Sequence, residues 1–319
     1  MELPEGKRIL FGVLDWGLGH ATRSVPLIKK LAEKNDVILA STGRAMDFLI
    51  GYFPTLPHTE KPGYNIAYSS NRSAFLAIVL QSLKITKAIL AEHRWLEGFI
   101  KKEKIDVVYS DNCYGLYNHN IPSIIITHQL MLKMPIGLKW MEPFAHQWVL
   151  KKIDCFDQCL IPDFEGTDNL SGDLSHLYPL PEHIEFIGPQ SRFEYPPSIP
   201  MTEKQYDVVV LVSGPEPARS SFEAELKNQL IGTNQKVALV RGIPGNTKII
   251  KENNLDIYDH LNDAELIPIL LNSKKIICRS GYSTIMDLNA LKRTAEFIPT
   301  SGQTEQEYLA EYRSSKRNQ

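Results

Sequence analysis

Short apolar runs alternate with segments of helical periodicity along most of the chain. Apolar runs bounded by turn residues are typical of buried parallel strands, and apolar residues three or four apart are typical of helices. In the first part of the sequence, the pattern predicts strands at 8–14, 37–40, 105–109 and 123–127. It predicts helical segments at 22–33 and 73–104, the second as one helix or two.

A proline-rich stretch at 188–206 interrupts this alternation and is interpreted as an interdomain linker. Strands alternating with helices favour parallel sheets covered by helices on both faces. We therefore predict an α/β fold with two Rossmann-like domains, residues 1–190 and 191–319, whose sheets face a central cleft. After the linker, strands are predicted at 207–212, 236–241, 256–258, 275–278 and 295–298, with helices at 218–230, 264–271, 284–291 and 303–313.

The net charge, the length of the apolar runs and the cysteine spacing exclude several classes of function. A formal net charge of -2 gives no electrostatic reason to expect a nucleic-acid partner. No stretch approaches the ~20 apolar residues of a membrane span, and the N-terminus lacks a signal-peptide pattern. The four cysteines do not suggest a disulfide framework, and Cys155 and Cys159 have no second pair at zinc spacing. We expect a cytoplasmic protein without a cofactor or a metal site.

A glycine-rich turn follows the first predicted strand and carries Gly17, Gly19 and His20. The third glycine of a dinucleotide fingerprint is missing, so dinucleotide binding is not favoured. A histidine at a strand end suits a proton acceptor, and Asp111, at the same expected sheet edge, suits a carboxylate that orients it. The alternatives are a plain tight turn at His20 and a turn cap at Asp111, with Asn112 beside it.

Three turns in the second half also join a strand to a helix. Such turns offer backbone N–H groups and hydroxyls to a phosphate, and an acid one turn into the helix can bind ribose. The alternatives are simple strand–helix loops, an acid favoured by the helix dipole, and a capping segment. The candidate donor-binding residues are Ser213 and Gly214; Ser280, Gly281, Ser283, Thr284 and Asp287; and Gln303, Glu305 and Gln306.

These turns resemble the motifs of MurG-like, family-28 glycosyltransferases, which have the GT-B fold and are related to UDP-glycosyltransferases. The resemblance is best in the second half, around Arg279, Ser280 and Gly281. It implies that Asp287 binds ribose, that its neighbours face the diphosphate, and that residues 302–306 form the donor-sugar loop. It further implies a backbone contact of Leu261 with uracil and a phosphate contact of Arg192.

In the first half, the 17–20 turn resembles the acceptor-side turn of that family. His128 stands in a segment like the family's His-Glu-Gln, with the acid missing, and Asn112 is assigned to the acceptor side with it. Two further departures are Pro215, Glu216 and Pro217, which replace flexible residues, and a chain that stops soon after Tyr312, which implies a shortened C-terminal region.

The resemblance implies transfer of a hexose or N-acetylhexosamine from a UDP-sugar to a hydroxyl acceptor, with inversion. No Asp-x-Asp occurs, so we expect metal-independent chemistry. One alternative is a nucleotide-sugar hydrolase or epimerase, because 17–23 also resembles the Gly-x-Gly-His-x-x-Arg turn of GT-B-like hydrolases in nonulosonate synthesis. Another is a non-catalytic sugar-nucleotide binder.

The stretch at 129–149 is rich in Leu, Met, Trp and Phe. Such stripes usually belong to a core, so a buried helix pair lining the acceptor side is expected. The alternative is contact with a lipid-linked acceptor, which would make the protein peripheral to a membrane.

Overall fold

The computed structural model describes residues 3–64, 74–193, 205–214, 216–243 and 248–317. The chain divides into two compact units. The first contains residues 1–16 and 20–190, and the second contains 17–19 and 191–319. Most of the predicted linker, at 194–204, lies outside the described residues.

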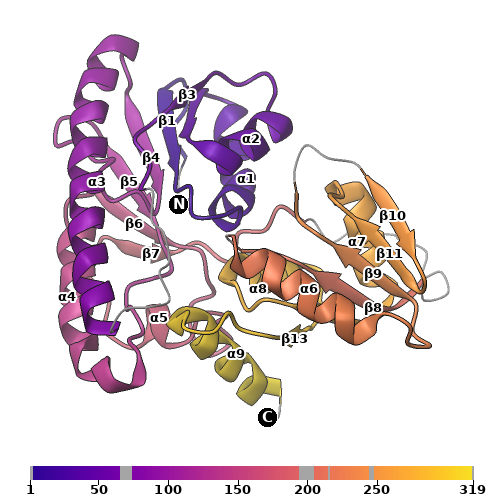
Figure 1. The fold of residues 1–319 in the computed structure, drawn as a ribbon. Helices are drawn as coiled ribbons and strands as arrows, with labels where there is room; N and C mark the ends of the chain where they lie inside the picture. The colour runs from indigo at the N-terminus through magenta and orange to yellow at the C-terminus, as the bar shows by residue number, and fades with distance from the viewer. Residues whose placement is uncertain (1–2, 65–73, 194–204, 215, 244–247, 318–319) are drawn as a thin grey trace. The chain divides into compact units, whose positions relative to one another are not determined.

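The first unit is built on a sheet whose strands are all parallel, in the order β3-β2-β1-β4-β5-β6-β7 (Figure 1). Its central strands β4 and β5 are fully buried, as their mainly apolar sequences predict. The strands are β1 (Arg8–Val13), β2 (Asp36–Ser41), β3 (His58–Glu60), β4 (Val107–Asp111), β5 (Ser123–Ile126), β6 (Gln158–Ile161) and β7 (Ile184–Phe186).

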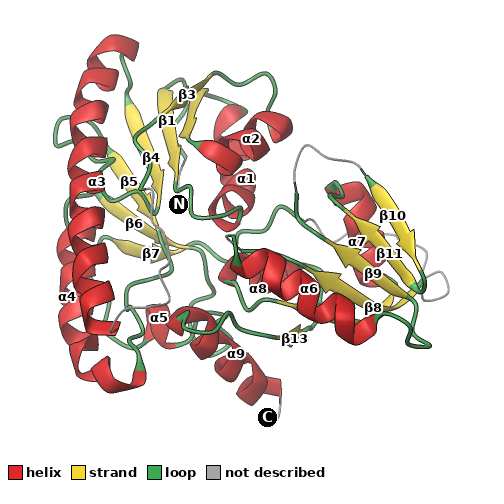
Figure 2. Ribbon diagram, viewed as in Figure 1, coloured by secondary structure: helices red, strands yellow, loops and turns green. Residues whose placement is uncertain are grey.

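Helices cover both faces of this sheet, with α3 and α4 on one side and α1 and α2 on the other (Figure 2). Of the segment predicted at 73–104, residues 74–103 form one continuous helix. The helices are α1 (Gly19–Ala32), α2 (Gly43–Tyr52), α3 (Ala74–Glu103), α4 (Glu142–Ile153) and the short α5 (Asp173–His176), with a 3-10 helix η1 (Ile136–Met141) before α4.

The second unit contains a sheet in the order β10-β11-β9-β8-β12-β13. Helix α6 packs on one face through Phe222 and Leu226, and α7 and α8 pack on the other through residues such as Leu270 and Leu288. The elements are β8 (Tyr206–Leu211), α6 (Ala218–Leu230), β9 (Val237–Val240), β10 (Ile249–Glu252), β11 (Leu255–Tyr258), α7 (Asp263–Leu271), β12 (Ser273–Cys278), α8 (Tyr282–Ala290), β13 (Glu296–Phe297) and α9 (Thr304–Arg317).

An antiparallel edge strand, β10, is the element of the second sheet that the sequence pattern did not predict. It forms a tight hairpin with β11, in which Glu252 pairs with Leu255. Asn253, between them, has φ 53°, a left-handed conformation that asparagine adopts more readily than most residues. An Asn-Asn pair between two short strands is a hairpin signal, but β10 exposes alternate residues and lacks the apolar run of a buried strand.

The 129–149 stretch does not form the buried helix pair that its composition predicts. Helix α4 buries His146, Val149 and Ile153, whereas no residue of η1 is buried. Apolar side chains instead reach the surface: Ile136 is 90% exposed, Trp140 64% and Phe144 69%. A long apolar side chain is buried only where another element covers it, and no element of the described ranges covers these three side chains.

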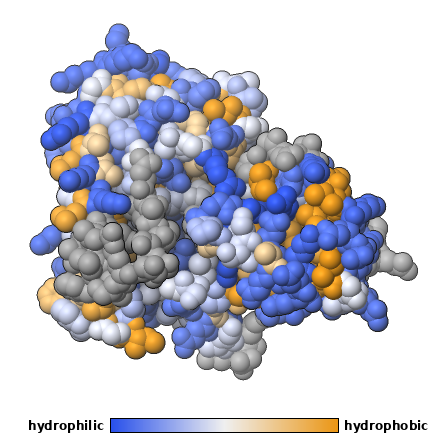
Figure 3. Space-filling view, viewed as in Figure 1, coloured by the Kyte–Doolittle hydropathy of each residue, from blue (hydrophilic) through white to orange (hydrophobic). Residues whose placement is uncertain are grey.

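On the face that Figure 3 shows, apolar residues occur in small groups among polar ones. Among the described residues, no helix is both long and apolar enough to cross a membrane.

A buried ion pair ties the end of β3 to α3. The Lys61 ammonium lies 2.7 Å from one Glu92 carboxylate oxygen, and both side chains are fully buried. The other oxygen accepts from the Tyr64 hydroxyl at 2.7 Å and from the Gly115 amide at 3.2 Å. A Cβ at position 115 would collide with the carbonyl oxygen of Ile89, so glycine permits this close approach. The carboxylate therefore holds the chain after β3 and after β4 against α3.

Replacing Lys61 by Met should lower the free energy of unfolding by about 3–5 kcal/mol, because Glu92 would keep a buried charge without its cation. Urea denaturation at neutral pH measures the change. The control is the same substitution at exposed Lys30, which should stay within about 0.5 kcal/mol of the unchanged protein. Equal stabilities for the two variants would contradict a structural role for the pair.

Candidate functional site

The order of the first sheet creates a switch point between β1 and β4. The chain runs outward from β1 through β2 and β3 on one side, and from β4 onward on the other. Open α/β sheets bind ligands beyond the carboxyl ends of strands at such a point. Val13 pairs with Asp111 in register, so the turn that leaves β1 and the last residue of β4 meet at one edge.

His20 and Asp111 are in contact at this edge, as the sequence predicts. His20 Nδ1 lies 2.7 Å from Asp111 Oδ1, and the His20 side chain keeps 14% of its surface exposed while Asp111 keeps 1%. His20 is the second residue of α1, which begins directly at the glycine-rich turn. Gly17 in that turn has φ 74°, a conformation that favours glycine. The pair has the geometry of a histidine base oriented by a carboxylate.

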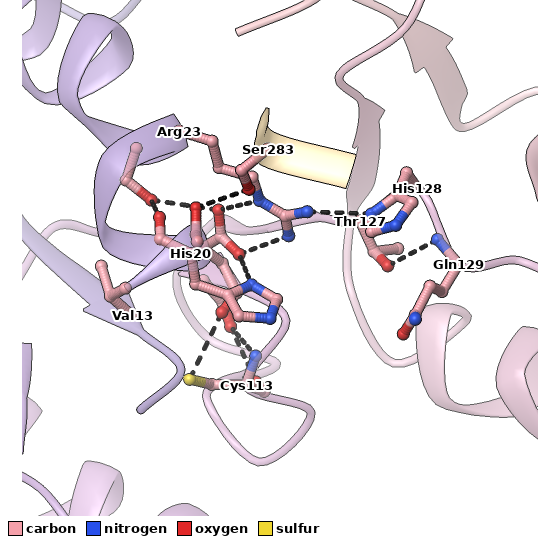
Figure 4. A network of polar contacts seen from close by, with 12 residues as sticks. Val13, His20, Arg23, Cys113, Thr127, His128, Gln129 and Ser283 are labelled. Atoms are coloured by element: carbon pink, nitrogen blue, oxygen red, sulfur yellow. Dashed lines mark hydrogen bonds and ion pairs between the residues drawn. The ribbon is translucent and has the colours of Figure 1, made fainter. Parts of the chain in front are cut away.

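Arg23, which the sequence analysis noted only as the last residue of a hydrolase-like turn and gave no site role, holds the same carboxylate (Figure 4). Its guanidinium donates from Nε to Asp111 Oδ2 at 2.8 Å and from Nη2 to Oδ1 at 2.5 Å. Burial acts to raise the pKa of Asp111, but the charge of Arg23 and the bond from His20 outweigh it and hold the pKa well below its usual range. Asp111 is therefore an ionised carboxylate in a buried place. The spacing of three residues from His20 on one helix was the available signal for Arg23.

Two further side chains complete this network (Figure 4). The Ser24 hydroxyl lies 3.0 Å from Asp111 Oδ2 and 2.8 Å from the His20 carbonyl oxygen. Arg23 Nη1 lies 2.8 Å from Nδ1 of His128, which follows β5 and is buried. The structure thus brings the predicted residues His20, Asp111 and His128 together through Arg23.

Asn112 provides an unusual acceptor beside this network. Its backbone has φ 58°, and the residue is 5% exposed. Among the described residues, no donor reaches its buried side-chain oxygen, and the same holds for Oδ1 of Asp15, which follows β1. A buried oxygen without a donor is costly, so both atoms suit a ligand that brings N–H or O–H groups.

The second sheet has a comparable switch point between β8 and β12. The chain leaves β12 through Arg279 and Ser280, and Gly281 is the N-cap of α8 with no side-chain cap bond. The N-cap residue therefore offers no side-chain acceptor to the first-turn N–H groups of α8. Ser283 and Thr284 lie in that first turn, and the Ser280 hydroxyl donates to the Gln306 carbonyl oxygen at 2.7 Å.

Asp287 lies one turn into α8 and is nearly buried. Its Oδ1 accepts from the Ser191 hydroxyl at 2.6 Å, and its Oδ2 is 3.9 Å from Arg192 Nε. Burial raises the pKa of Asp287 to about 6, although Arg192 and the Ser191 bond act in the opposite direction. Arg192 itself contacts Asp263 at 2.9 Å. The predicted ribose acid and the predicted phosphate contact are thus neighbours within the second unit.

The turn that carries Ser213 and Gly214, which are predicted to bind the sugar donor, has a carboxylate close by. Glu216 occupies the start of α6, where it accepts from the Ser220 amide at 3.2 Å and from Arg219 at 2.6 Å. A carboxylate in that place repels a phosphate, which weakens the role predicted for Ser213 and Gly214.

Arg279 stacks 3.8 Å from the Phe222 ring and donates to two carbonyl oxygens after β13. The Gln306 side chain accepts from the Thr300 amide at 2.8 Å. Leu261 is buried in the core under α7, and Gln303 and Glu305 are half-buried around the start of α9.

Replacing Asp287 by Asn should remove a pH dependence of stability. The folded pKa of about 6 exceeds the ordinary value of 3.8, so the stability that protonated Asp287 contributes is fully present below the ordinary pKa and is lost as pH rises through about 6. Between about pH 4 and 7, the unchanged protein should lose about 2–3 kcal/mol of unfolding free energy relative to the Asn variant. Urea denaturation at both values measures this difference. An identical pH slope in the variant would contradict it, and exposed Glu225→Gln is the control.

Comparison with known proteins supplies the context for these two sites. Residues 7–152 match the model of the family described as glycosyl transferase family 1. This match covers most of the first unit, whereas the motif resemblance was best in the second half. No curated protein sequence matches the chain.

Solved glycosyltransferase structures are similar over nearly the whole chain. CalG4, the calicheamicin glycosyltransferase, has 12% identity and a TM-score of 0.62, with 97% of this chain and 84% of that chain covered. MurG of Acinetobacter baumannii has 13% identity and a TM-score of 0.53, with 97% and 83% covered. A UDP-glucosyltransferase of Polygonum tinctorium has 14% identity and a TM-score of 0.59, with 97% and 83% covered. The chain therefore has the GT-B fold of these glycosyltransferases, MurG among them, as its motifs predict, and its residues 7–152 match the glycosyl transferase family 1 model.

Proposed function

We propose that the protein transfers a hexose or N-acetylhexosamine from a UDP-sugar to a hydroxyl acceptor, with inversion and without a metal ion. The observation that carries this proposal is the contact of His20 with Asp111 at the switch point of the first sheet. Two of the similar solved structures are named as MurG and as a UDP-glucosyltransferase, which supports a UDP-sugar donor.

His20 is the proposed general base. Its Nδ1 proton is bonded to the ionised Asp111, so its Nε2 carries a lone pair. Nε2 takes the proton of the acceptor hydroxyl while the hydroxyl oxygen attacks C1 of the donor sugar. The bond from C1 to the phosphate oxygen breaks, and UDP leaves with the electron pair. Asp111 stabilises the imidazolium that forms, and attack opposite the leaving group inverts C1.

The donor is assigned to the second unit. The first-turn N–H groups of α8 and the hydroxyls of Ser283 and Thr284 suit a diphosphate. Ionised Asp287 accepts hydrogen bonds from the ribose hydroxyls, which compete for the oxygen that now bonds Ser191. These groups supply the charge stabilisation that a metal ion would otherwise give to departing UDP.

A lipid-linked acceptor at a membrane surface fits the exposed side of η1 and α4. Ile136, Trp140 and Phe144 are exposed there beside the exposed Lys139. Apolar side chains next to a lysine suit the boundary of an anionic bilayer.

The double variant Trp140→Ser/Phe144→Ser should reduce co-sedimentation with vesicles of phosphatidylcholine and phosphatidylglycerol, because it removes the apolar contact area. Leu90→Ser, a substitution of a 50% exposed leucine on α3, is the control and should leave co-sedimentation unchanged. Absence of vesicle binding by the unchanged protein would remove the membrane proposal and leave the transferase proposal standing.

Replacing His20 by Ala should lower sugar transfer by about 10²–10⁴-fold, the usual contribution of a positioned base. Binding of UDP-N-acetylglucosamine, followed by thermal shift, should not change, because the donor contacts other residues. UDP release in the presence of a membrane lipid extract measures turnover. The control is His58→Ala, at an exposed histidine on β3. Unchanged turnover in the His20 variant would show that His20 is not the base.

The second candidate function is hydrolysis of the nucleotide sugar. Arg23 favours it, because it completes the Gly-x-Gly-His-x-x-Arg turn and binds the carboxylate behind His20. Incubation with UDP-N-acetylglucosamine in buffer alone separates the two activities. Free sugar released as fast as UDP, with no stimulation by the lipid extract, would favour the hydrolase. UDP binding without turnover across UDP-sugars would favour the non-catalytic binder.

A further inference from the structure

Two histidines in the first unit share one arginine. Arg23 donates two bonds to Asp111, which bonds His20 Nδ1, and a third bond from Nη1 to His128 Nδ1. Arg23 is 3% exposed, Asp111 1% and His128 4%, so solvent does not compete strongly for these bonds. The hydrogen-bonding capacities of the partners therefore decide where each ring carries its proton.

A guanidinium has N–H donors and no acceptor. Nδ1 of His128, 2.8 Å from Arg23, must therefore accept, and the proton of its neutral ring sits on Nε2. An ionised carboxylate only accepts, so Nδ1 of His20, 2.7 Å from Asp111, must donate, and its neutral ring has a lone pair on Nε2. The two rings thus hold their protons on opposite nitrogens.

We infer that Arg23 is a positioning residue that sets opposite tautomers in the two histidines, so that His20 presents a proton acceptor and His128 an N–H group. The claim that this serves sugar transfer rests on the proposed function, whereas the tautomers themselves do not. The lone pair on Nε2 of His20 is the acceptor that the proposed general base requires.

The charge of Arg23 also opposes protonation of His20. The charged or titratable groups around His20 are Asp111 from β4, Arg23 from α1 and His128 after β5. The Cys113 thiol and the Tyr114 hydroxyl, which follow β4, also interact with Asp111 and Arg23 respectively, and burial raises the pKa of both groups, so both are neutral. Asp111 alone would favour the imidazolium form of His20, and the guanidinium opposes it by neutralising the carboxylate. Removal of the Arg23 charge should therefore favour the imidazolium form of His20.

The direct test is the tautomer of each ring in the whole protein. The chain has nine histidines, and long-range ¹H–¹⁵N correlation spectra of ¹⁵N-histidine-labelled protein report the protonated nitrogen of each. His20→Asn and His128→Asn spectra assign the two signals. We expect the proton on Nδ1 of His20 and on Nε2 of His128 at about pH 7.5, above the ordinary histidine pKa. A neutral His128 with its proton on Nδ1, or a doubly protonated ring, would overturn the inference without any turnover measurement.

Arg23→Gln tests whether Arg23 is the cause. His128 should then populate both tautomers, and the protonation midpoint of His20 should rise by about one pH unit, because Asp111 loses its cation. Exposed Arg94→Gln is the matched control and should leave both signals unchanged. A folded Arg23→Gln variant with an unchanged His128 tautomer and His20 midpoint would refute the role of Arg23. If that variant does not fold, the spectrum of the unchanged protein decides the question.

Discussion

A buried carboxylate that must remain charged organises the first unit. Asp111 is 1% exposed, and a carboxylate in such a place is unstable unless cationic and hydrogen-bonding partners surround it. Arg23, Ser24 and His20 supply those partners from a single helix, so α1 is joined to the end of β4 by side-chain bonds as well as by packing. His128 joins the same network through Arg23. Stability and candidate chemistry therefore depend on one charge.

The pKa values of the acids near the two switch points are shifted in opposite directions. Asp111 has a guanidinium in direct contact with both oxygens, which keeps its pKa low. Asp287 has Arg192 at 3.9 Å, and that arginine also contacts Asp263, so burial dominates and the pKa of Asp287 rises. A permanently ionised acid suits the orientation of a base. An acid that is easily neutralised is stable without a ligand and gains hydrogen bonds when ribose hydroxyls approach.

Sequence periodicity predicted the four central strands of the first sheet and all strands of the second except β10, because these strands are short apolar runs. It did not predict β3, β6, β7 or α2, and β3 is a short polar edge strand without such a run. The pairing of His20 with Asp111 was predictable because carboxyl ends of adjacent parallel strands share one edge. Arg23 was not selected, because an arginine in a helix usually lies on a solvated face and only the tertiary structure shows the buried carboxylate beside it. The hydrogen bond by which Glu216 caps the start of α6 could not be predicted either, since its partners depend on the turn geometry. Exposure of Trp140 depends on which elements cover η1, which local pattern does not determine.

The charge state of Asp111 is the measurement that tests this account most directly. Carboxyl ¹³C shifts of the protein labelled at aspartate, with the Asp111 signal assigned from Asp111→Asn, follow its ionisation as pH falls. The account predicts that Asp111 stays ionised at about pH 4, where an ordinary aspartate is half protonated. A protonation midpoint at or above that pH would contradict it, because burial would then outweigh Arg23 and no fixed charge would orient His20.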